Sequence, residues 1–217
     1  MSVPPSHPRW YLLRHAQPLV EAGVCYGQWD IAADQAATND AAHAFARHLC
    51  EAQDLRSSSP LLLQCSPLQR CQQLADALLP LLQQHGIQAT LQNDTRLAEL
   101  DFGTWEGQPW SRITPEQWQA WTSDFAHYPP GGGESTMQLL QRVRAAADEA
   151  LRWLQQNPNG KVVWISHAGV MRALHWLQQH GATPPATAGA WPKEGACGYG
   201  QWLEVGADVH LLRTGDA

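Results

Sequence analysis

Two short apolar runs that each lead into a histidine constrain the fold of this chain most. The first, Trp10–Leu13, is followed by Arg14 and His15. The second, Val162–Ser166, is followed by His167. Continuous apolar runs of this length are typical of strands buried on both faces of a parallel sheet. Ligands of such sheets bind beyond the carboxyl ends of the strands. If the two strands are neighbours, both imidazoles therefore lie together at the ligand-binding edge.

Strand and helix patterns alternate along the rest of the chain, which predicts an α/β fold: a three-layer α/β/α sandwich around a mainly parallel central sheet. We expect one domain, 1–217, with a lid-like insertion at about 103–135. The expected helices cover about 35–51, 66–86, 114–125, 135–156 and 169–180. Further strands are expected at 61–65 and 89–92, and a closing hairpin at 199–205 and 209–212.

Composition limits the classes of partner. Of the 217 residues, 44% are hydrophobic and 16% charged, which indicates a folded globular protein. The net charge of −6 argues against broad binding of nucleic acid or anionic membranes. Neither an apolar leader at residues 1–9 nor a long apolar span is evident, and the five cysteines show no metal-site spacing. These features predict a cytoplasmic protein with reduced thiols.

The residues after the two strands suit an anionic ligand. Arginine can fork two donors onto phosphate or carboxylate oxygens, and histidine can attack or carry a proton near neutral pH. Ser66-Pro67 has the form of a helix start, which places Arg70 in a first turn where the backbone also favours an anion. We therefore expect Arg14, His15, Arg70 and His167 to surround one anion.

Several of these stretches resemble the signatures of one enzyme family. Leu13-Arg14-His15-Ala16 is similar to the Arg-His-Gly signature of the histidine phosphatase (phosphoglycerate-mutase-like) superfamily. The similarity extends from about Trp10 to Leu177. The further matching stretches, in family order, are Ser66–Cys71, Glu99–Gly103, Trp105–Gly107 and Ser166–Gly169.

The resemblance implies a metal-independent phosphatase without a cofactor. His15 would form a phosphohistidine, and Arg14, Arg70 and His167 would hold the phosphoryl oxygens. Glu99 would be the general acid and base, with Asp101 and Glu106 as rival carboxylates. The expected partner is a small phosphorylated metabolite, and homodimer formation stays open.

Other positions bear on the subfamily. Much of the superfamily has Glu-Thr after the signature and an Asn three residues later, whereas this chain has Gln17, Pro18 and Glu21. The stretches that resemble the alpha-ribazole phosphatases of cobalamin biosynthesis are Gln17-Pro18, Gly23–Gly27 with Asp30, and Pro130–Ser135. The resemblance favours alpha-ribazole 5'-phosphate as substrate, with Gln17, Tyr26 and Gly27 lining the entrance.

Three alternatives remain at this point. A phosphoglycerate mutase would share the fold, but the Asn is absent and the insertion is short for that branch. A non-catalytic phosphate-binding module would keep the same residues without turnover. A metal hydrolase using some of the ten histidines lacks a His-x-x-x-His pair with supporting carboxylates. The tryptophans near the insertion, Trp105, Trp110, Trp118 and Trp121, favour packing over contact with a flat ligand.

Overall fold

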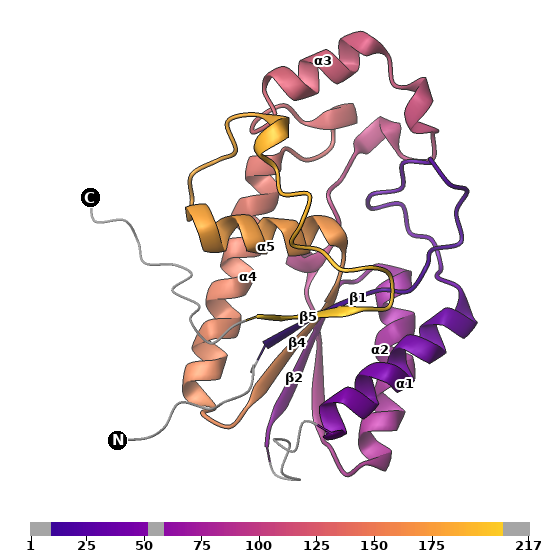
Figure 1. Ribbon diagram of the computed structural model, residues 1–217, viewed down its shortest axis with the longest axis vertical. Helices are drawn as coiled ribbons and strands as arrows, with labels where there is room; N and C mark the ends of the chain where they lie inside the picture. Colours follow the sequence, from indigo (N-terminus) through magenta and orange to yellow (C-terminus); the bar gives the residue numbers. More distant parts are fainter. Residues whose placement is uncertain (1–9, 52–58, 206–217) are drawn as a thin grey trace.

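The computed structural model describes residues 10–51 and 59–205, and a five-stranded sheet forms its centre (Figure 1). The strand order is β3-β2-β4-β1-β5. The first four strands run parallel and β5 pairs antiparallel with β1. The strands are β1 (Trp10–Arg14), β2 (Leu61–Cys65), β3 (Ala89–Asn93), β4 (Lys161–Ser166) and β5 (Trp202–Val205).

Helices cover both faces of this sheet. On one face, α1 (Gln35–Glu51) and α2 (Gln69–Gln84) bury side chains such as Phe45 and Leu74. On the other face lie α4 (Thr136–Gln156) and α5 (Ala168–His180) with a second apolar cluster. Every residue of β4 is buried between the layers. The predicted three-layer sandwich is confirmed (Figure 1).

The start of α2 differs from the prediction. The helix begins at Gln69, with Leu68 rather than Ser66 at the N-cap position and no side-chain cap. Ser66 is buried, and its hydroxyl lies 2.7 Å from a ring nitrogen of His167. Arg70 is the second residue of α2, so it still lies in the first turn.

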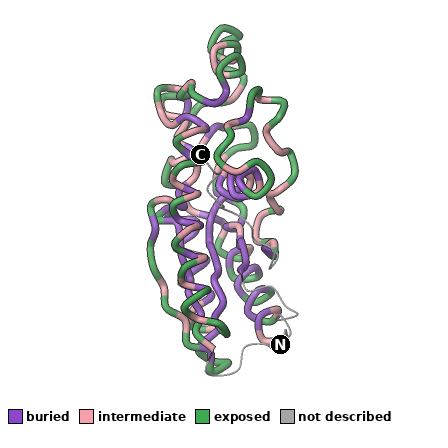
Figure 2. Tube along the Cα trace, turned by 90° about the vertical axis from the view of Figure 1, so that its left-hand side faces the viewer, coloured by how far each residue is buried: buried purple, intermediate pink, exposed green. Residues whose placement is uncertain are grey.

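The segment 103–135 stands above the end of the sheet and carries α3 (Pro115–Ser123), at the top of Figure 1. Thr114 and Ser135 form the two predicted capping boxes, which open α3 and α4. Much of the segment is exposed (Figure 2), although Trp105 and Ile113 are buried beside Cys25. The lid-like role expected of this insertion stays a prediction. Short 3-10 helices occur at Thr95–Leu97, Gly103–Trp105, Trp110–Arg112, Pro130–Gly132 and Ala188–Ala190.

The last strand of the described chain, β5, is shorter than expected. The predicted strand at 199–205 begins only at Trp202, because Gly198–Gly200 turn the chain beside the carboxyl end of β1. The predicted strand at 209–212 lies outside the described residues. Within residues 10–51 and 59–205, no helix has the length and apolar character that crossing a bilayer requires.

Candidate active site

The strand ends bring the two histidines together. β1 and β4 are neighbours, and Arg14 pairs in register with Ser166. His15 and His167 each follow one residue later, and their ring centroids lie 5.0 Å apart. Both side chains are almost completely buried. The sheet register therefore places two imidazoles side by side at its carboxyl edge.

His15 has the protonation state that a nucleophile needs. Its Nδ1 lies 2.7 Å from the carbonyl oxygen of Ala16, so Nδ1 carries the proton and donates, which leaves a lone pair on Nε2. Burial, followed by the charge of Arg70 and to a lesser extent that of Arg14, lowers the pKa of His15 to about 3, against the opposing hydrogen bond to Ala16. The ring is neutral at physiological pH.

His167 presents the complementary ring nitrogen. Its Nε2 lies 2.7 Å from Ser66 Oγ and 3.5 Å from Cys71 Sγ. If the Ser66 hydroxyl donates to Nε2, then Nδ1 carries the proton, and Nδ1 is buried without a partner among the described residues. Burial, and then the charges of His15 and Arg70, lower the pKa of His167 well below its usual value.

Arg70 brings a buried positive charge to the two rings. Its side chain is completely buried, with Nη2 donating to the Gly27 carbonyl at 2.6 Å and Nη1 to the Trp29 carbonyl at 3.0 Å. A Cβ at position 27 would overlap Glu106 Oε1 and lie 2.6 Å from the Leu100 carbonyl oxygen. Gly27 therefore contacts Arg70 through its carbonyl, and its backbone fits against Glu106 and Leu100 only because it has no side chain.

A pair of tyrosines lies against the two arginines. The guanidinium carbon of Arg14 lies 3.9 Å from the ring centroid of Tyr199, and Arg14 Nη1 donates to the Cys197 carbonyl at 2.8 Å. The hydroxyls of Tyr199 and Tyr26 are 2.8 Å apart, and the Tyr26 ring centroid lies 5.3 Å from the Arg70 guanidinium carbon. Sequence reasoning predicted Tyr26 but missed Tyr199, which it placed only at the start of the expected strand 199–205.

Three buried donors of this cluster lack acceptors among the described residues. Neither Arg14 nor Arg70 forms an ion pair with a carboxylate of the described residues. Arg14 Nε, Arg70 Nε and His167 Nδ1 are buried without hydrogen-bond partners in the same part of the chain. Buried positive charge without a counter-charge is costly, and an anion with several oxygens would satisfy all three donors. The arrangement can bind a tetrahedral oxyanion such as phosphate.

Glu99 lies beside this cluster, at the start of α5. Its Oε2 accepts from the Gly169 N–H at 3.2 Å, and its Oε1 accepts from the Leu100 N–H at 3.0 Å. A Cβ on Gly169 would overlap Glu99 Oε1, so the carboxylate occupies the space that the missing side chain leaves. Because Gly169 follows His167 by two residues, Glu99 lies near the predicted phosphate site.

The two rival carboxylates hold turns of the backbone. Asp101 Oδ1 accepts from the Gly103 N–H at 2.7 Å. Glu106 Oε1 accepts from the Gln28 N–H at 2.7 Å and the Phe102 N–H at 2.9 Å. Glu99 also accepts from backbone N–H groups, but it alone of the three contacts Gly169, two residues after His167, and this position favours it as the proton donor. Of the predicted entrance residues, Gln17 has an exposed side chain, and only its carbonyl makes a contact, with the Asp34 N–H, so its role stays a prediction.

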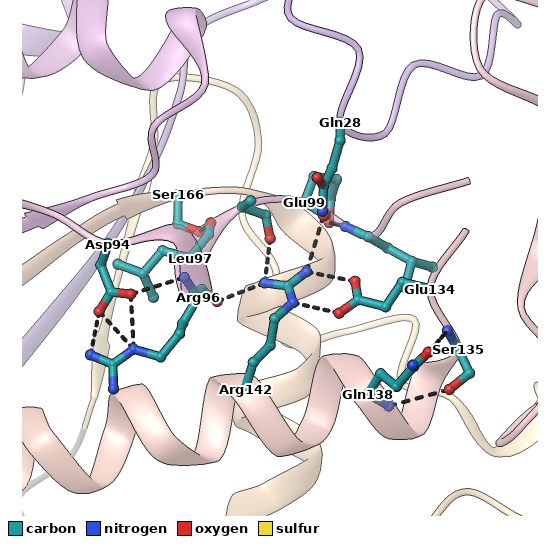
Figure 3. Close-up of polar contacts among 12 residues, drawn as sticks. Gln28, Asp94, Arg96, Leu97, Glu99, Glu134, Ser135, Gln138, Arg142 and Ser166 are labelled. Atoms are coloured by element: carbon teal, nitrogen blue, oxygen red, sulfur yellow. Dashed lines mark hydrogen bonds and ion pairs between the residues drawn. The ribbon is translucent and has the colours of Figure 1, made fainter. Parts of the chain in front are cut away.

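Arg142, which sequence reasoning missed, holds the segment that carries Glu99. Figure 3 shows its side chain reaching from α4 toward the backbone of residues 96–99. Its Nη1 donates to the carbonyls of Arg96 and Ala98 at 2.6 and 2.7 Å, and its Nη2 donates to that of Glu99 at 3.0 Å. Glu134 receives two further bonds from Arg142, at 2.6 and 2.8 Å. Gln28 Nε2 also donates to the Glu99 carbonyl, at 2.9 Å.

Next to Glu99 the structure has a cavity of about 530 Å³ with several aromatic side chains in its wall. Trp110, Trp118 and Trp121 contribute to these walls, so the tryptophans that were expected to serve packing also border open space. Metal ligands are not gathered here: in the described part of the chain, no three His, Cys, Asp or Glu side chains are grouped to hold an ion.

Comparison with known proteins is consistent with this geometry. The structure of a mycobacterial glucosyl-3-phosphoglycerate phosphatase superposes with a TM-score of 0.67 at 29% identity, covering 90% of this chain and 88% of that one. A putative alpha-ribazole-5'-P phosphatase from Escherichia coli gives 0.63 at 25% identity, covering 82% of each chain.

Among curated proteins, the bifunctional protein Rv2228c of Mycobacterium tuberculosis is 34% identical over 84 residues, which are 37% of this chain and 22% of that protein. The chain thus matches about a fifth of the length of such relatives. The family model for the histidine phosphatase superfamily (branch 1) matches residues 10–189. The chain therefore belongs to the histidine phosphatase superfamily.

Proposed function

We propose that this protein is a phosphomonoesterase that hydrolyses a small phosphate ester through a phosphohistidine on His15. The observation that carries the proposal is a neutral imidazole next to two guanidiniums that have no carboxylate partner among the described residues. A neutral ring can attack phosphorus, and positioned cations stabilise the charge that spreads over the phosphoryl oxygens in the transition state.

The reaction has two steps. His15 Nε2 forms a bond to phosphorus while the bond to the leaving oxygen breaks, and protonated Glu99 gives its proton to that oxygen. Water then attacks the phosphohistidine, Glu99 takes a proton from the water, and the N–P bond breaks to release phosphate. Arg14, Arg70 and His167 Nδ1 hold the phosphoryl oxygens throughout. No metal or cofactor enters either step.

Alpha-ribazole 5'-phosphate is the substrate that we favour. Supporting this choice are the relative from Escherichia coli and the stretches Gln17-Pro18 and Gly23–Gly27. Glucosyl-3-phosphoglycerate, named for the mycobacterial relative, is the competing phosphatase substrate. Phosphoglycerate mutase activity is the second candidate function, because a phosphohistidine can also return its phosphoryl group to an alcohol. Cytoplasmic location stays a prediction, and homodimer formation stays open.

The test is rapid quenching with a substrate labelled in its phosphoryl group. We expect an acid-labile label on the wild-type protein and none on His15→Ala. A panel of phosphate esters, with and without chelator, identifies the substrate, and activity should resist the chelator and be inhibited by vanadate. Label that survives in His15→Ala, or activity that disappears with chelator and returns with metal, would contradict the proposal. Conversion of 3- to 2-phosphoglycerate with little hydrolysis would favour the mutase.

A further inference from the structure

The cavity beside Glu99 shares two residues with the candidate active site. Glu99 and Gly169 line it, and both belong to the catalytic end of the sheet. The rest of the wall comes from residues 100–125, which include α3, from the start of α4, from α5 and from the loop after α5, which rises toward α3 in Figure 1. Its side chains include Trp110, Trp118, Trp121, Trp191, Arg172 and Lys193.

The position of the cavity assigns it to one part of the substrate. A general acid must touch the leaving oxygen, so the carbon skeleton of the leaving alcohol begins next to Glu99. On the other side of that oxygen, His15 and the arginines hold the phosphoryl group. The space that Glu99 itself lines is therefore available to the alcohol. A volume of about 530 Å³ falls within the range of small-molecule sites.

The wall of the cavity is suited to a flat ring. The ring centroid of Trp118 lies 5.8 Å from that of Trp110, with an interplanar angle of 38°. It lies 5.4 Å from that of Trp121, with an interplanar angle of 34°. These indoles pack against one another, but part of each indole still faces the open space of the cavity. Aromatic faces at such distances favour a further ring stacked or tilted against them.

Two donors in the same wall lack acceptors. Trp121 Nε1 and Arg172 Nε are buried without a hydrogen-bond partner among the described residues. Lys193 adds a second cation at the exposed side. A buried donor without an acceptor is destabilising, and an oxygen or ring nitrogen of a bound group would remove that cost.

We propose that this cavity binds the leaving alcohol of the substrate and selects a flat ring that carries a hydrogen-bond acceptor or a negative group. Trp118 is the stacking surface, and Trp121 and Arg172 are the donors. The inference rests on the proposed phosphatase function, because only then does Glu99 face a leaving group. Arg172 and Trp118 are specificity residues in this scheme and take no part in the bond changes.

The experiment uses four esters of primary alcohols, so that the leaving oxygen is chemically similar in each: propyl, 2-cyclohexylethyl, 2-phenylethyl and 2-(4-carboxyphenyl)ethyl phosphate. We expect kcat/KM for the phenyl ester to exceed that for the cyclohexyl ester about fivefold, since the two rings differ mainly in flatness. The carboxylate should add about tenfold through Arg172. Trp118→Leu should remove the first preference and Arg172→Gln the second.

The ratio between two esters is the readout, so it does not depend on the amount of folded enzyme. Trp202→Leu is the matched control, because Trp202 packs in the cluster around Phe45, on the opposite face of the sheet. Its ratios should equal those of the wild type. Equal kcat/KM for the phenyl and cyclohexyl esters, or ratios that Trp118→Leu and Arg172→Gln leave unchanged, would overturn the inference while the phosphatase function stands.

Failure of the proposed function has a different result, namely no hydrolysis of any ester. The cavity is then still testable by the indole fluorescence of His15→Ala, titrated with the phenyl and cyclohexyl esters. Tighter binding of the phenyl ester that is lost in Trp118→Leu would support the pocket without the chemistry. Equal binding of both esters would overturn it.

Discussion

His15 and His167 are similar in burial but opposite in what each ring offers. The Ala16 carbonyl holds the proton on His15 Nδ1, so that Nε2 keeps the free lone pair that the proposed nucleophile needs. The Ser66 hydroxyl faces His167 Nε2, so that Nδ1 can donate to a phosphoryl oxygen. One backbone oxygen and one side-chain hydroxyl thus give two identical residues different chemical roles.

The lowered pKa of His15 predicts a loss of stability in acid. The ring has its ordinary pKa of 6.5 in the unfolded chain and about 3 in the folded protein. Between these values the unfolded state binds the extra proton, so the free energy of unfolding falls as the pH drops from 6.5 toward 3. We expect wild type to lose about 2 kcal/mol more than His15→Asn between pH 6.5 and 4.5. Urea unfolding at a series of pH values measures the difference.

The control for this measurement is His43→Asn, because His43 is an exposed residue of α1. Its stability curve should follow that of the wild type at every pH. Parallel curves for wild type and His15→Asn would show that His15 is not buried in its neutral form.

An added methyl group at Gly169 should lower the activity, because Gly169 lies directly against Glu99. Alanine at this position would place Cβ against Glu99 Oε1 and displace the carboxylate. Because general acids contribute about 10²–10⁴ in rate, we expect Gly169→Ala to lower hydrolysis of alkyl phosphates by about 10² or more. p-Nitrophenyl phosphate, whose leaving group needs no proton, should be affected much less. Alanine favours the helix, so the melting temperature should not fall; equal losses on both esters would contradict the prediction.

In the candidate active site, the sequence predicts which residues lie at the strand ends better than it predicts which side chains contact one another. The strand ends predict Arg14, His15 and His167, because position after a buried strand depends only on the local pattern. The Ser-Pro pattern suggested a cap for Ser66, whereas the structure places its hydroxyl next to His167, which is 101 residues distant in sequence. Such a contact depends on which strands are neighbours, and a local pattern does not carry that information.

Among the elements, α4 has a task beyond covering the sheet. Its residue Arg142 gives three hydrogen bonds to the carbonyls of residues 96–99, a segment without regular strand structure (Figure 3). The guanidinium can do this because its donors are fixed in one plane. The apolar spacing and capping box predicted the bounds of α4 correctly. They could not predict Arg142, because an arginine on the polar side of a helix is ordinarily solvated.

Arg142→Lys tests whether this helix positions Glu99. Lysine keeps the charge next to Glu134, but a single ammonium cannot span three carbonyls and a carboxylate. We expect hydrolysis of alkyl phosphates to fall about tenfold, with a much smaller effect on p-nitrophenyl phosphate, since only the former needs a well-placed acid. Steady-state kinetics on both esters measures the effect.

The matched control is Arg152→Lys, an exposed arginine on the same helix. Its ratio of alkyl to p-nitrophenyl hydrolysis should equal that of the wild type. If Arg142→Lys lowers both esters by the same factor, Arg142 supports folding in general and does not position Glu99.

The molecule as a whole carries a net charge of −6, yet its candidate active site is positive. An anion is therefore attracted by the local field of Arg14 and Arg70 and not by the average charge of the surface. Because this charge is buried, salt screens it less than it would screen exposed residues. The site exists only in the folded state, where the strand ends are assembled. A phosphate analogue that binds there therefore raises the free energy of unfolding.

Vanadate should consequently raise the melting temperature of the intact protein. At a concentration of about 100 times its dissociation constant, a ligand adds about 2.7 kcal/mol to the free energy of unfolding. For a chain of this size that corresponds to an increase of about 5–10 °C, measured by thermal scanning with and without vanadate. Arg70→Met should lose most of the shift, whereas Arg47→Gln, an exposed arginine of α1, should keep it. A shift that persists in Arg70→Met would mean that vanadate binds elsewhere, and the convergence of the two strand ends with α2 on a single anion would then be wrong.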